Sequence, residues 1–387
     1  MHEQTDIAII GAGIAGISAA ASAIQAYPEA SILIVSDEAG LPYKRTTLSK
    51  KLAEGVTAES FNLPRFTEEI LPLVRYIPAL RVTALDTIQR TLTTTDGRAI
   101  AAKTIILACG SVPRTPRCGW QSAILPFRTR EDALTLSPFL QPGGKILVGG
   151  DGVLAVELAC QCSRAGMQVT LAGRNRHILQ RQFDQESASR LEGLLGQHAI
   201  HWLPETDIDT LDHVDGKPLL AQDNASFDCA VIAAGVVPRT GLLPHPAGIP
   251  VDQHCQTGSK GIFAAGDCST HEGVVTTLWH QAEAQGKIAG LNAAASLKGL
   301  PLAPYTMQPQ RVKCRIFDCF TWSCNPGATP DSVEIISSGP MFVRLLGVAG
   351  HMAGATAIGI PEELDASLSE AVRDAWPLEQ VRRLLTC

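Results

Sequence analysis

One pattern constrains the fold more than any other. A glycine-rich turn stands between a short apolar run and a helical stretch, and the pattern occurs twice in the chain. Such an apolar run is typical of a buried parallel strand, and a second apolar run follows each helix. Strand, turn, helix and strand together form the βαβ unit that binds dinucleotides. Two copies predict two nucleotide-binding domains of the α/β class. The first copy has a strand at residues 6–10, the turn at 11–16, a helix at 14–26 and a second strand at 31–35. The second copy has a strand at residues 144–148, the turn at 150–155, a helix at 154–165 and a second strand at 168–172.

The first turn has the pattern GxGxxG, with Gly11, Gly13 and Gly16 at its fixed places. Gly11 permits the tight turn, Gly13 leaves room for a pyrophosphate beside the backbone, and Gly16 allows close packing of helix and strand. The N-terminus of the helix then offers free N–H groups and partial positive charge to the phosphates. A carboxylate after the second strand should accept hydrogen bonds from the adenosine ribose. Asp37 holds that place, with Glu38 as the alternative.

The second turn follows the variant pattern GxGxxA. Its fixed places are held by Gly150, Gly152 and Ala155. Asp151 stands between the two glycines, an unusual anion so close to phosphates. No acid follows the second strand, where NAD-binding domains hold the ribose 2′-hydroxyl. Arg174 and Arg176 stand there instead and are able to bind the 2′-phosphate of NADP. They favour NADPH, with NADH or dual use left open and an ordinary solvated loop as the alternative interpretation.

Composition excludes several classes of function. The chain has 387 residues, of which 45% are hydrophobic and 18% charged, a balance typical of globular domains with ample apolar surface to bury. A net charge of -6 argues against nucleic acid or a membrane surface as the main partner. The sequence contains neither a membrane-length apolar run nor a signal-like start, so we expect a cytoplasmic protein. Its 11 cysteines lack a disulfide framework and are expected to be free thiols.

A change of texture after Leu300 indicates a further small domain. Pro301, Pro304 and Pro309 mark a linker. Strands are then expected at residues 333–336 and 341–346, and a mostly helical stretch at residues 364–385, which together predict an α+β domain.

Four segments outside the two turns resemble the FAD-dependent pyridine nucleotide-disulfide oxidoreductase family, and in particular its branch of rubredoxin, ferredoxin and flavorubredoxin reductases. Residues 41–50 (LPYKRTTLSK) resemble that branch's PYxRPxLSK segment. Residues 104–114 (TIILACGSVPR) are similar to a strand that ends in ATGSxPR, with Cys109 in place of threonine. Residues 228–239 (DCAVIAAGVVPR) resemble a second segment of this kind, and residues 261–267 (GIFAAGD) resemble the second FAD motif.

The resemblance implies that FAD binds at the first turn and NADH or NADPH at the second. Asp267 ends an apolar run, so its carboxylate would accept a ribityl hydroxyl of FAD while Gly266 keeps the backbone close. The residues implied for FAD are Gly11, Gly13, Ala15, Gly16, Asp37, Glu38, Arg45, Lys50, Cys109, Gly110, Gly266, Asp267 and Trp279. Those implied for the nicotinamide dinucleotide are Gly150, Gly152, Ala155, Arg174, Arg176 and Gly235.

The resemblance implies that Lys50 and Glu157 are the catalytic residues. Lys50 would lie near the flavin N5 edge, where an ammonium stabilises the anionic reduced flavin. Glu157 would pair with Lys50 and keep it charged and oriented; a surface lysine and a helix-face glutamate are the alternative. Trp279 begins the helix whose N-terminus would face the flavin pyrimidine, and it is expected either beside the flavin ring or in the core.

The expected fold is therefore two Rossmann-like domains and a small α+β C-terminal domain. An FAD-binding domain would comprise residues 1–113 and 240–300, an NAD(P)-binding domain residues 114–239, and an interface domain residues 301–387. The implied enzyme is an NAD(P)H reductase that passes electrons through flavin to a rubredoxin-, ferredoxin- or flavodiiron-type protein. Alternatives are an NAD(P)H oxidase or a quinone or disulfide reductase and, in another class, a non-catalytic FAD-binding subunit of a larger complex. A homodimer is compatible with the resemblance.

The cysteines depart from the disulfide branch of the family. Residues 38–60 contain no cysteine, which favours transfer from flavin to an external acceptor. Cys314, Cys319 and Cys324 recur every five residues, and a single strand would place the first and last on one face and the middle one on the other. That spacing does not favour a metal site, and none is expected. Cys387 is interpreted as a free thiol, with a mobile redox thiol as the alternative.

Overall fold

The computed structural model describes residues 2–64, 66–220 and 224–386. Contacts divide the chain into two compact units. Unit 1 comprises residues 1–46, 58–112 and 236–307, and unit 2 comprises residues 47–57, 113–235 and 308–387. Within the described ranges, no helix is long and apolar enough to cross a bilayer.

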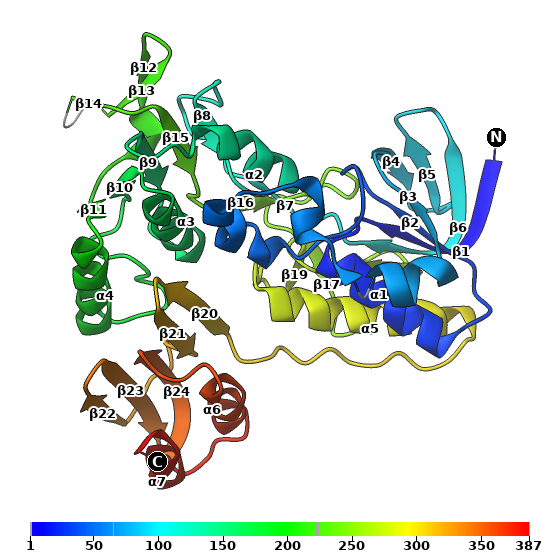
Figure 1. Cartoon of the computed structure of the whole chain (residues 1–387). Coiled ribbons are helices and arrows are strands. Elements are labelled where there is room, and N and C mark those ends of the chain that lie inside the picture. The colour runs from blue at the N-terminus through cyan, green and yellow to red at the C-terminus, as the bar shows by residue number, and fades with distance from the viewer. Residues whose placement is uncertain (1, 65, 221–223, 387) are drawn as a thin grey trace. The chain divides into compact units, whose positions relative to one another are not determined.

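A seven-stranded sheet forms the centre of unit 1 (Figure 1). Its order is β3-β2-β1-β6-β5-β4, and β18 pairs with β6. β1 runs parallel to β2 and β6, and β18 runs parallel to β6, so the carboxyl ends of these strands meet at one edge. Ile7 and Ile9 of β1 join one buried cluster while Ala8 and Ile10 join the other, as expected of a strand covered on both faces. The strands are β1 (His2–Ile10), β2 (Ile32–Val35), β3 (Arg75–Ile77), β4 (Val82–Asp86), β5 (Thr91–Thr94), β6 (Ala99–Leu107) and β18 (Ile262–Ala264).

Two helices of unit 1, α1 (Ile14–Ala26) and α5 (Trp279–Leu297), pack side by side (Figure 1). Glycines on α5 allow this close approach. A Cβ at Gly286 would lie 2.2 Å from the carbonyl O of Ala15, and a Cβ at Gly290 would lie 2.0 Å from that of Ala19. The absence of a side chain at both positions therefore lets the middle of α5 lie against the first two turns of α1.

Two small sheets and several short helices complete the elements. One two-stranded sheet pairs β7 (Ser111–Pro113) with β16 (Val236–Pro238), and another pairs β17 (Ile249–Val251) with β19 (Ser269–His271). The 3₁₀ helices are η1 (Arg45–Thr47), η2 (Ser49–Glu54), η3 (Ala58–Phe61), η5 (Leu71–Leu73), η6 (Ser137–Phe139) and η7 (Ile208–Thr210), and η4 (Phe66–Ile70) is a π-helix.

Unit 2 contains the second βαβ fold. Its parallel sheet has the order β11-β10-β9-β15-β8, with α3 between β9 and β10 in sequence (Figure 1). Every residue of β15 is buried, as a central parallel strand requires. The strands of this sheet are β8 (Ile124–Pro126), β9 (Lys145–Gly149), β10 (Gln168–Ala172), β11 (His201–Leu203) and β15 (Cys229–Ile232). The helices are α2 (Arg130–Leu136), α3 (Val153–Arg164) and α4 (Gln185–Gln197). A separate sheet contains β12 (Asp212–Val214), β13 (Lys217–Leu220) and β14 (Ala225–Ser226).

The C-terminal part of unit 2 is an antiparallel sheet of order β20-β21-β24-β23-β22 with two helices, α6 and α7, that contact β24 (Figure 1). Apolar residues of the sheet and both helices form one buried cluster, which includes Trp322, Leu345 and Val381. The elements are β20 (Arg311–Ile316), β21 (Cys319–Cys324), β22 (Ser332–Ser338), β23 (Met341–Val348), β24 (His351–Ile358), α6 (Leu364–Arg373) and α7 (Leu378–Thr386).

The prediction for Cys314, Cys319 and Cys324 is wrong, because they do not share one strand. The chain reverses at Phe317, which has φ 52°, and β20 and β21 form a hairpin. Cys314 lies opposite Thr321, and Cys319 lies opposite Ile316. Cys314 and Cys319 therefore share one face of the sheet and Cys324 lies on the other, where it joins the C-terminal core.

Candidate functional site

The first glycine-rich turn joins β1 to α1. Gly11 has φ +108°, and a Cβ there would lie 2.2 Å from the carbonyl O of Ala108. A Cβ at Gly16 would lie 2.0 Å from the carbonyl O of Gly11, so only glycine fits at both places. A Cβ at Gly13 would meet no described atom within 4 Å, and Gly13 is the N-cap of α1. The turn is thus closed at its flanks and open at the helix N-terminus, which fits a bound pyrophosphate.

The two candidate ribose carboxylates follow β2, and both bind arginine. Asp37 Oδ2 accepts a hydrogen bond from Arg239 Nη1 at 2.7 Å. Glu38 accepts one from the Tyr43 hydroxyl at 2.6 Å and forms an ion pair with Arg45. Burial opposes the ionisation of Glu38, but the charge of Arg45 and the Tyr43 hydrogen bond hold its pKa below the ordinary value. Both Glu38 oxygens are engaged, whereas Asp37 Oδ1 accepts no hydrogen bond from the described residues. The geometry favours Asp37 as the ribose acceptor.

Asp267 lies beyond β18, at the edge where the parallel strands of unit 1 end. Its Oδ2 accepts a hydrogen bond from Ser111 Oγ at 2.8 Å. The N–H of Gly266 donates to Oε1 of Gln285 on α5 at 2.8 Å, and Gly266 and Gly110 have φ +78° and +69°. These bonds join β7 and α5 to the segment that follows β18 and hold the Asp267 carboxylate in place. Ser111 and Gln285 were not singled out from the sequence, because their partners are 156 and 19 residues away.

Cys109 contacts another thiol at the same edge. A hydrogen bond to Cys268, together with burial, raises the pKa of the Cys109 thiol well above its usual value. All ten cysteines in the described part of the chain are free thiols, and Cys387 lies outside it. Across the same residues, no group of three or more His, Cys, Asp or Glu side chains could hold a metal ion.

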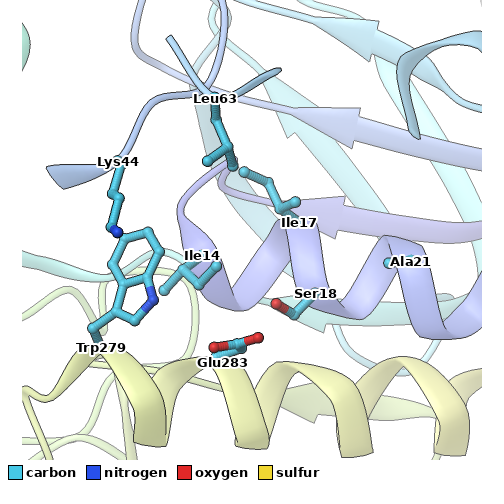
Figure 2. Close-up of a pocket in the computed structure, with 8 residues that line it drawn as sticks. All are labelled: Ile14, Ile17, Ser18, Ala21, Lys44, Leu63, Trp279 and Glu283. Carbon is cyan, nitrogen blue, oxygen red and sulfur yellow. The ribbon is translucent and has the colours of Figure 1, made fainter. Parts of the chain in front are cut away.

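Trp279 opens α5 and lines a cavity of about 170 Å³ between α1 and α5 (Figure 2). Lys44 Nζ lies 5.9 Å from the centre of the Trp279 ring. The indole lies near Ile14 of α1 and Lys44, and Glu283 lies one turn along α5 (Figure 2). Trp279 is half-buried and belongs to neither hydrophobic cluster of unit 1.

The second glycine-rich turn joins β9 to α3 in unit 2 and repeats the design of the first. Gly150 has φ +133°, and a Cβ there would lie 2.6 Å from the carbonyl O of Ala233 and 3.2 Å from the Cβ of Ala155. Gly152 is the N-cap of α3 and has no described atom within 4 Å of its Cβ position. Gly235, with φ +102°, is equally open. The turn therefore fits the phosphates of a second dinucleotide.

Arg174 and Arg176 follow β10, and both side chains are exposed. The charge of Arg174 contributes, after that of Arg114, to a lowered pKa at the buried carboxyl of Asp209. Arg114 itself forms two hydrogen bonds to Asp209, at 2.8 and 3.0 Å. Asp151, in the glycine-rich turn, lies against Gly173 at the end of β10. The end of this strand is therefore a mixed-charge environment with arginines at its outer side.

Lys50 and Glu157 form an ion pair within unit 2. Lys50 Nζ lies 3.8 Å from Oε1 of Glu157 on α3, and Ser49 Oγ donates to Oε2 of the same carboxylate at 2.7 Å. Burial raises the pKa of Glu157, although Lys50 and the Ser49 hydrogen bond oppose the shift. The Lys50 side chain is 47% exposed and that of Glu157 only 10%. The predicted pair is present, with a buried carboxylate that anchors an accessible ammonium.

The sequence-predicted residues fall into two groups. Unit 1 brings together Gly11, Gly13, Ala15, Gly16, Asp37, Glu38, Arg45, Cys109, Gly110, Gly266, Asp267 and Trp279, and unit 2 holds Lys50, Gly150, Gly152, Ala155, Glu157, Arg174, Arg176 and Gly235. The residues present fit FAD in unit 1 and a nicotinamide dinucleotide in unit 2. Each unit offers one open position at a helix N-terminus after a parallel strand, and the carboxylates of Asp37 and Asp267 are fixed beside that of unit 1.

Comparison with known proteins finds relatives that match most of the chain. Residues 5–286 match the family model of the pyridine nucleotide-disulphide oxidoreductases. The ferredoxin–NAD(+) reductase subunit of the benzene 1,2-dioxygenase system of Pseudomonas putida is 28% identical over 275 residues, 68% of this chain and 67% of that protein. The NADH-rubredoxin oxidoreductase of Clostridium acetobutylicum is 26% identical over 296 residues, 75% of each. Among the solved structures, a chain of the covalent putidaredoxin reductase-putidaredoxin complex matches this chain with a TM-score of 0.84 at 22% identity. The match covers 96% of this chain and 94% of that one.

Proposed function

Because the chain belongs to the pyridine nucleotide-disulphide oxidoreductase family, we propose that it is an FAD-dependent enzyme that oxidises NADH or NADPH and passes the electrons to a separate redox protein. The observation that carries the proposal is the pair of glycine-rich βαβ turns, one in each compact unit, closed at the flanks and open at the N-terminus of the helix. One such turn accommodates one dinucleotide. A chain with two therefore holds a nicotinamide donor and a flavin acceptor at once.

Each group of residues has a distinct role in this proposal. Bound FAD supplies the redox chemistry, because a flavin accepts hydride from a nicotinamide and releases electrons to an acceptor. Asp37 holds the adenosine ribose, and Asp267 orients a ribityl hydroxyl. The Lys50 ammonium, held by Glu157, stabilises negative charge on the reduced cofactor.

The acceptor is proposed from the relatives. The names of two of them specify ferredoxin and rubredoxin as electron-transfer partners. We infer that this chain reduces a small redox protein of the rubredoxin, ferredoxin or flavodiiron type. We also propose a division of labour in which residues 1–113 and 240–300 bind FAD, residues 114–239 bind the nicotinamide dinucleotide, and residues 301–387 contribute to docking or to a homodimer. A cytoplasmic location is proposed because reducing compartments maintain free thiols such as those of the described cysteines.

Anaerobic stopped-flow reduction tests the enzyme assignment. The purified FAD-loaded protein is mixed with NADH or with NADPH, flavin absorbance is followed, and air is admitted afterwards. Rapid bleaching with slow reoxidation, together with fast reoxidation by added rubredoxin or ferredoxin, is the expected result. Rapid reoxidation by air alone would instead identify an oxidase. Absence of bleaching with both nucleotides would refute the enzyme and leave a flavin-binding subunit.

A further inference from the structure

The end of β10 lacks the carboxylate with which NAD-binding domains hold the adenosine ribose. The strand ends at Ala172, and Gly173 occupies the place where such an acid would stand. A Cβ at Gly173 would lie 2.8 Å from both Cβ and Oδ2 of Asp151, and 3.0 Å from the Trp202 ring. The Asp151 side chain, which comes from the glycine-rich turn, therefore fills the space in which an acid at position 173 would begin.

Hydrogen bonds fix Asp151 in this place. The N–H of Asn175 donates to Oδ2 at 3.1 Å, and the N–H of Leu179 donates to the carbonyl O of Asp151 at 2.7 Å. The side chain is half-buried. Within the part of the chain that the structure describes, its Oδ1 accepts no hydrogen bond. One carboxylate oxygen is thus held by the protein, and the other remains available to a ligand.

The charges around this carboxylate oppose a second anion. The N–H of Thr206 donates to the carbonyl O of Gly173 at 2.9 Å, which brings the segment that carries Asp209 alongside the end of β10. Asp209 is buried, and Arg174 lies close enough to stabilise its negative charge. The hydrogen bonds from Arg114 lower the pKa of Asp209 most, and the charge of Arg174 contributes to the same shift. A 2′-phosphate at this place would meet the negative charge of Asp151.

We propose that Asp151 accepts the hydroxyl hydrogen bonds of the adenosine ribose and thereby makes the chain favour NADH over NADPH. The inference rests on the proposed function, because it places the nicotinamide dinucleotide at the second turn. A carboxylate accepts hydrogen bonds from vicinal ribose hydroxyls, whereas a 2′-phosphate removes one of these donors and adds charge of the same sign. Asp151, in the glycine-rich turn, thus replaces the ribose-binding acid that is missing at the end of β10. Its effect on the choice between NADH and NADPH outweighs that of the exposed Arg174 and Arg176.

The first test compares nucleotides in one variant. Anaerobic flavin reduction is measured over a range of NADH and NADPH concentrations in the wild type and in Asp151→Asn, which keeps the side-chain size and removes the charge. The wild type should be reduced more efficiently by NADH. The ratio of the NADH to the NADPH rate constant should fall about ten- to hundred-fold in Asp151→Asn. Asp212→Asn, the same change at an exposed carboxylate on β12, is the matched control and should leave the ratio unchanged.

A second measurement does not depend on the folding of a variant. Calorimetric titration of the wild-type holoprotein with ADP-ribose and with its 2′-phosphate derivative compares the two adenosine groups directly. Tighter binding of ADP-ribose supports the inference. Tighter binding of the phosphorylated ligand, or an unchanged nucleotide ratio in Asp151→Asn, overturns it. If neither nucleotide bleaches the wild-type flavin, the proposed function fails, and the titration still decides which adenosine group the protein prefers.

Discussion

Replacement of Gly286 by alanine should destabilise unit 1 and weaken its hold on FAD. The new Cβ would lie 2.2 Å from the carbonyl O and 2.8 Å from the Cα of Ala15, whereas non-bonded carbon atoms pack at about 3.5–4.0 Å. Because these neighbours are backbone atoms, α1 and α5 must separate by about 1 Å to relieve the contact. Overpacking of this kind costs about 1–3 kcal/mol, partly offset by about 1 kcal/mol from the better helix propensity of alanine. We expect a net loss of about 1 kcal/mol, which lowers Tm by about 2–4 °C in a unit of this size.

The assay is thermal unfolding monitored by flavin fluorescence, with FAD content measured before heating. A displaced α1 should also release FAD more readily, since Ala15 adjoins the glycine-rich turn. Gly193→Ala on α4 is the control, because no described atom lies within 4 Å of its Cβ position. This variant should be more stable than the wild type by about 0.5–1 kcal/mol. Equal Tm and equal FAD content in Gly286→Ala and the wild type would refute the proposed contact between the helices.

Three further outcomes are expected. Lys50→Met should slow flavin reduction about a hundred-fold without loss of FAD, because it removes the ammonium that we propose stabilises negative charge on the reduced cofactor; an unchanged rate in stopped flow would exclude that role. Ser49→Ala removes a hydrogen-bond donor from Glu157, which should raise the pKa of Glu157 further and shift the pH profile of flavin reduction to higher pH, whereas a purely structural serine would leave the profile in place. Asp209→Asn should cost about 1–2 kcal/mol at neutral pH by breaking the ion pair with Arg114. Since the pKa of Asp209 is lowered in the folded state, this cost should disappear as pH falls through that pKa. Urea unfolding of both proteins at several pH values measures the cost, and a cost that does not change with pH would contradict the reasoning.

The two βαβ units were predictable from sequence because their signals are local. Glycine spacing and apolar runs fix the turn and the helix together, and the predicted bounds of α1 and β10 agree with the structure at both ends. The hairpin of β20 and β21 was not predictable in this way. Its turn uses Phe317 with φ 52°, a conformation that sequence patterns assign to glycine or asparagine. His198 stacks on Phe317 at 3.5 Å, and Arg164 pairs with the adjoining Asp318, so distant residues stabilise the turn.

The candidate site likewise contains residues that local motifs predict and residues that only the fold brings together. Gly11, Gly150 and Asp37 were recognised because each has a fixed place in a local motif. Arg239 was not, because its partner Asp37 lies 202 residues away and no spacing rule links them. The role of Asp151 also depends on packing, since its significance appears only when the end of β10 is placed beside the glycine-rich turn. Sequence patterns therefore located the motifs, and the fold determined which charged groups surround them.

The interleaving of the two units fixes the order in which they can mature on the ribosome. The strands β8 to β15 of the second nucleotide-binding sheet emerge as one continuous stretch, residues 124–232. The first sheet begins to be synthesised earlier but is completed later, because β18 and α5, at residues 262–297, must still be added to β6 and α1. Until then the apolar surface that α5 covers stays open on the nascent chain, where it is exposed to aggregation and to chaperones. Cofactor capture by the N-terminal turn is consequently a late event, even though its glycines are among the first residues made.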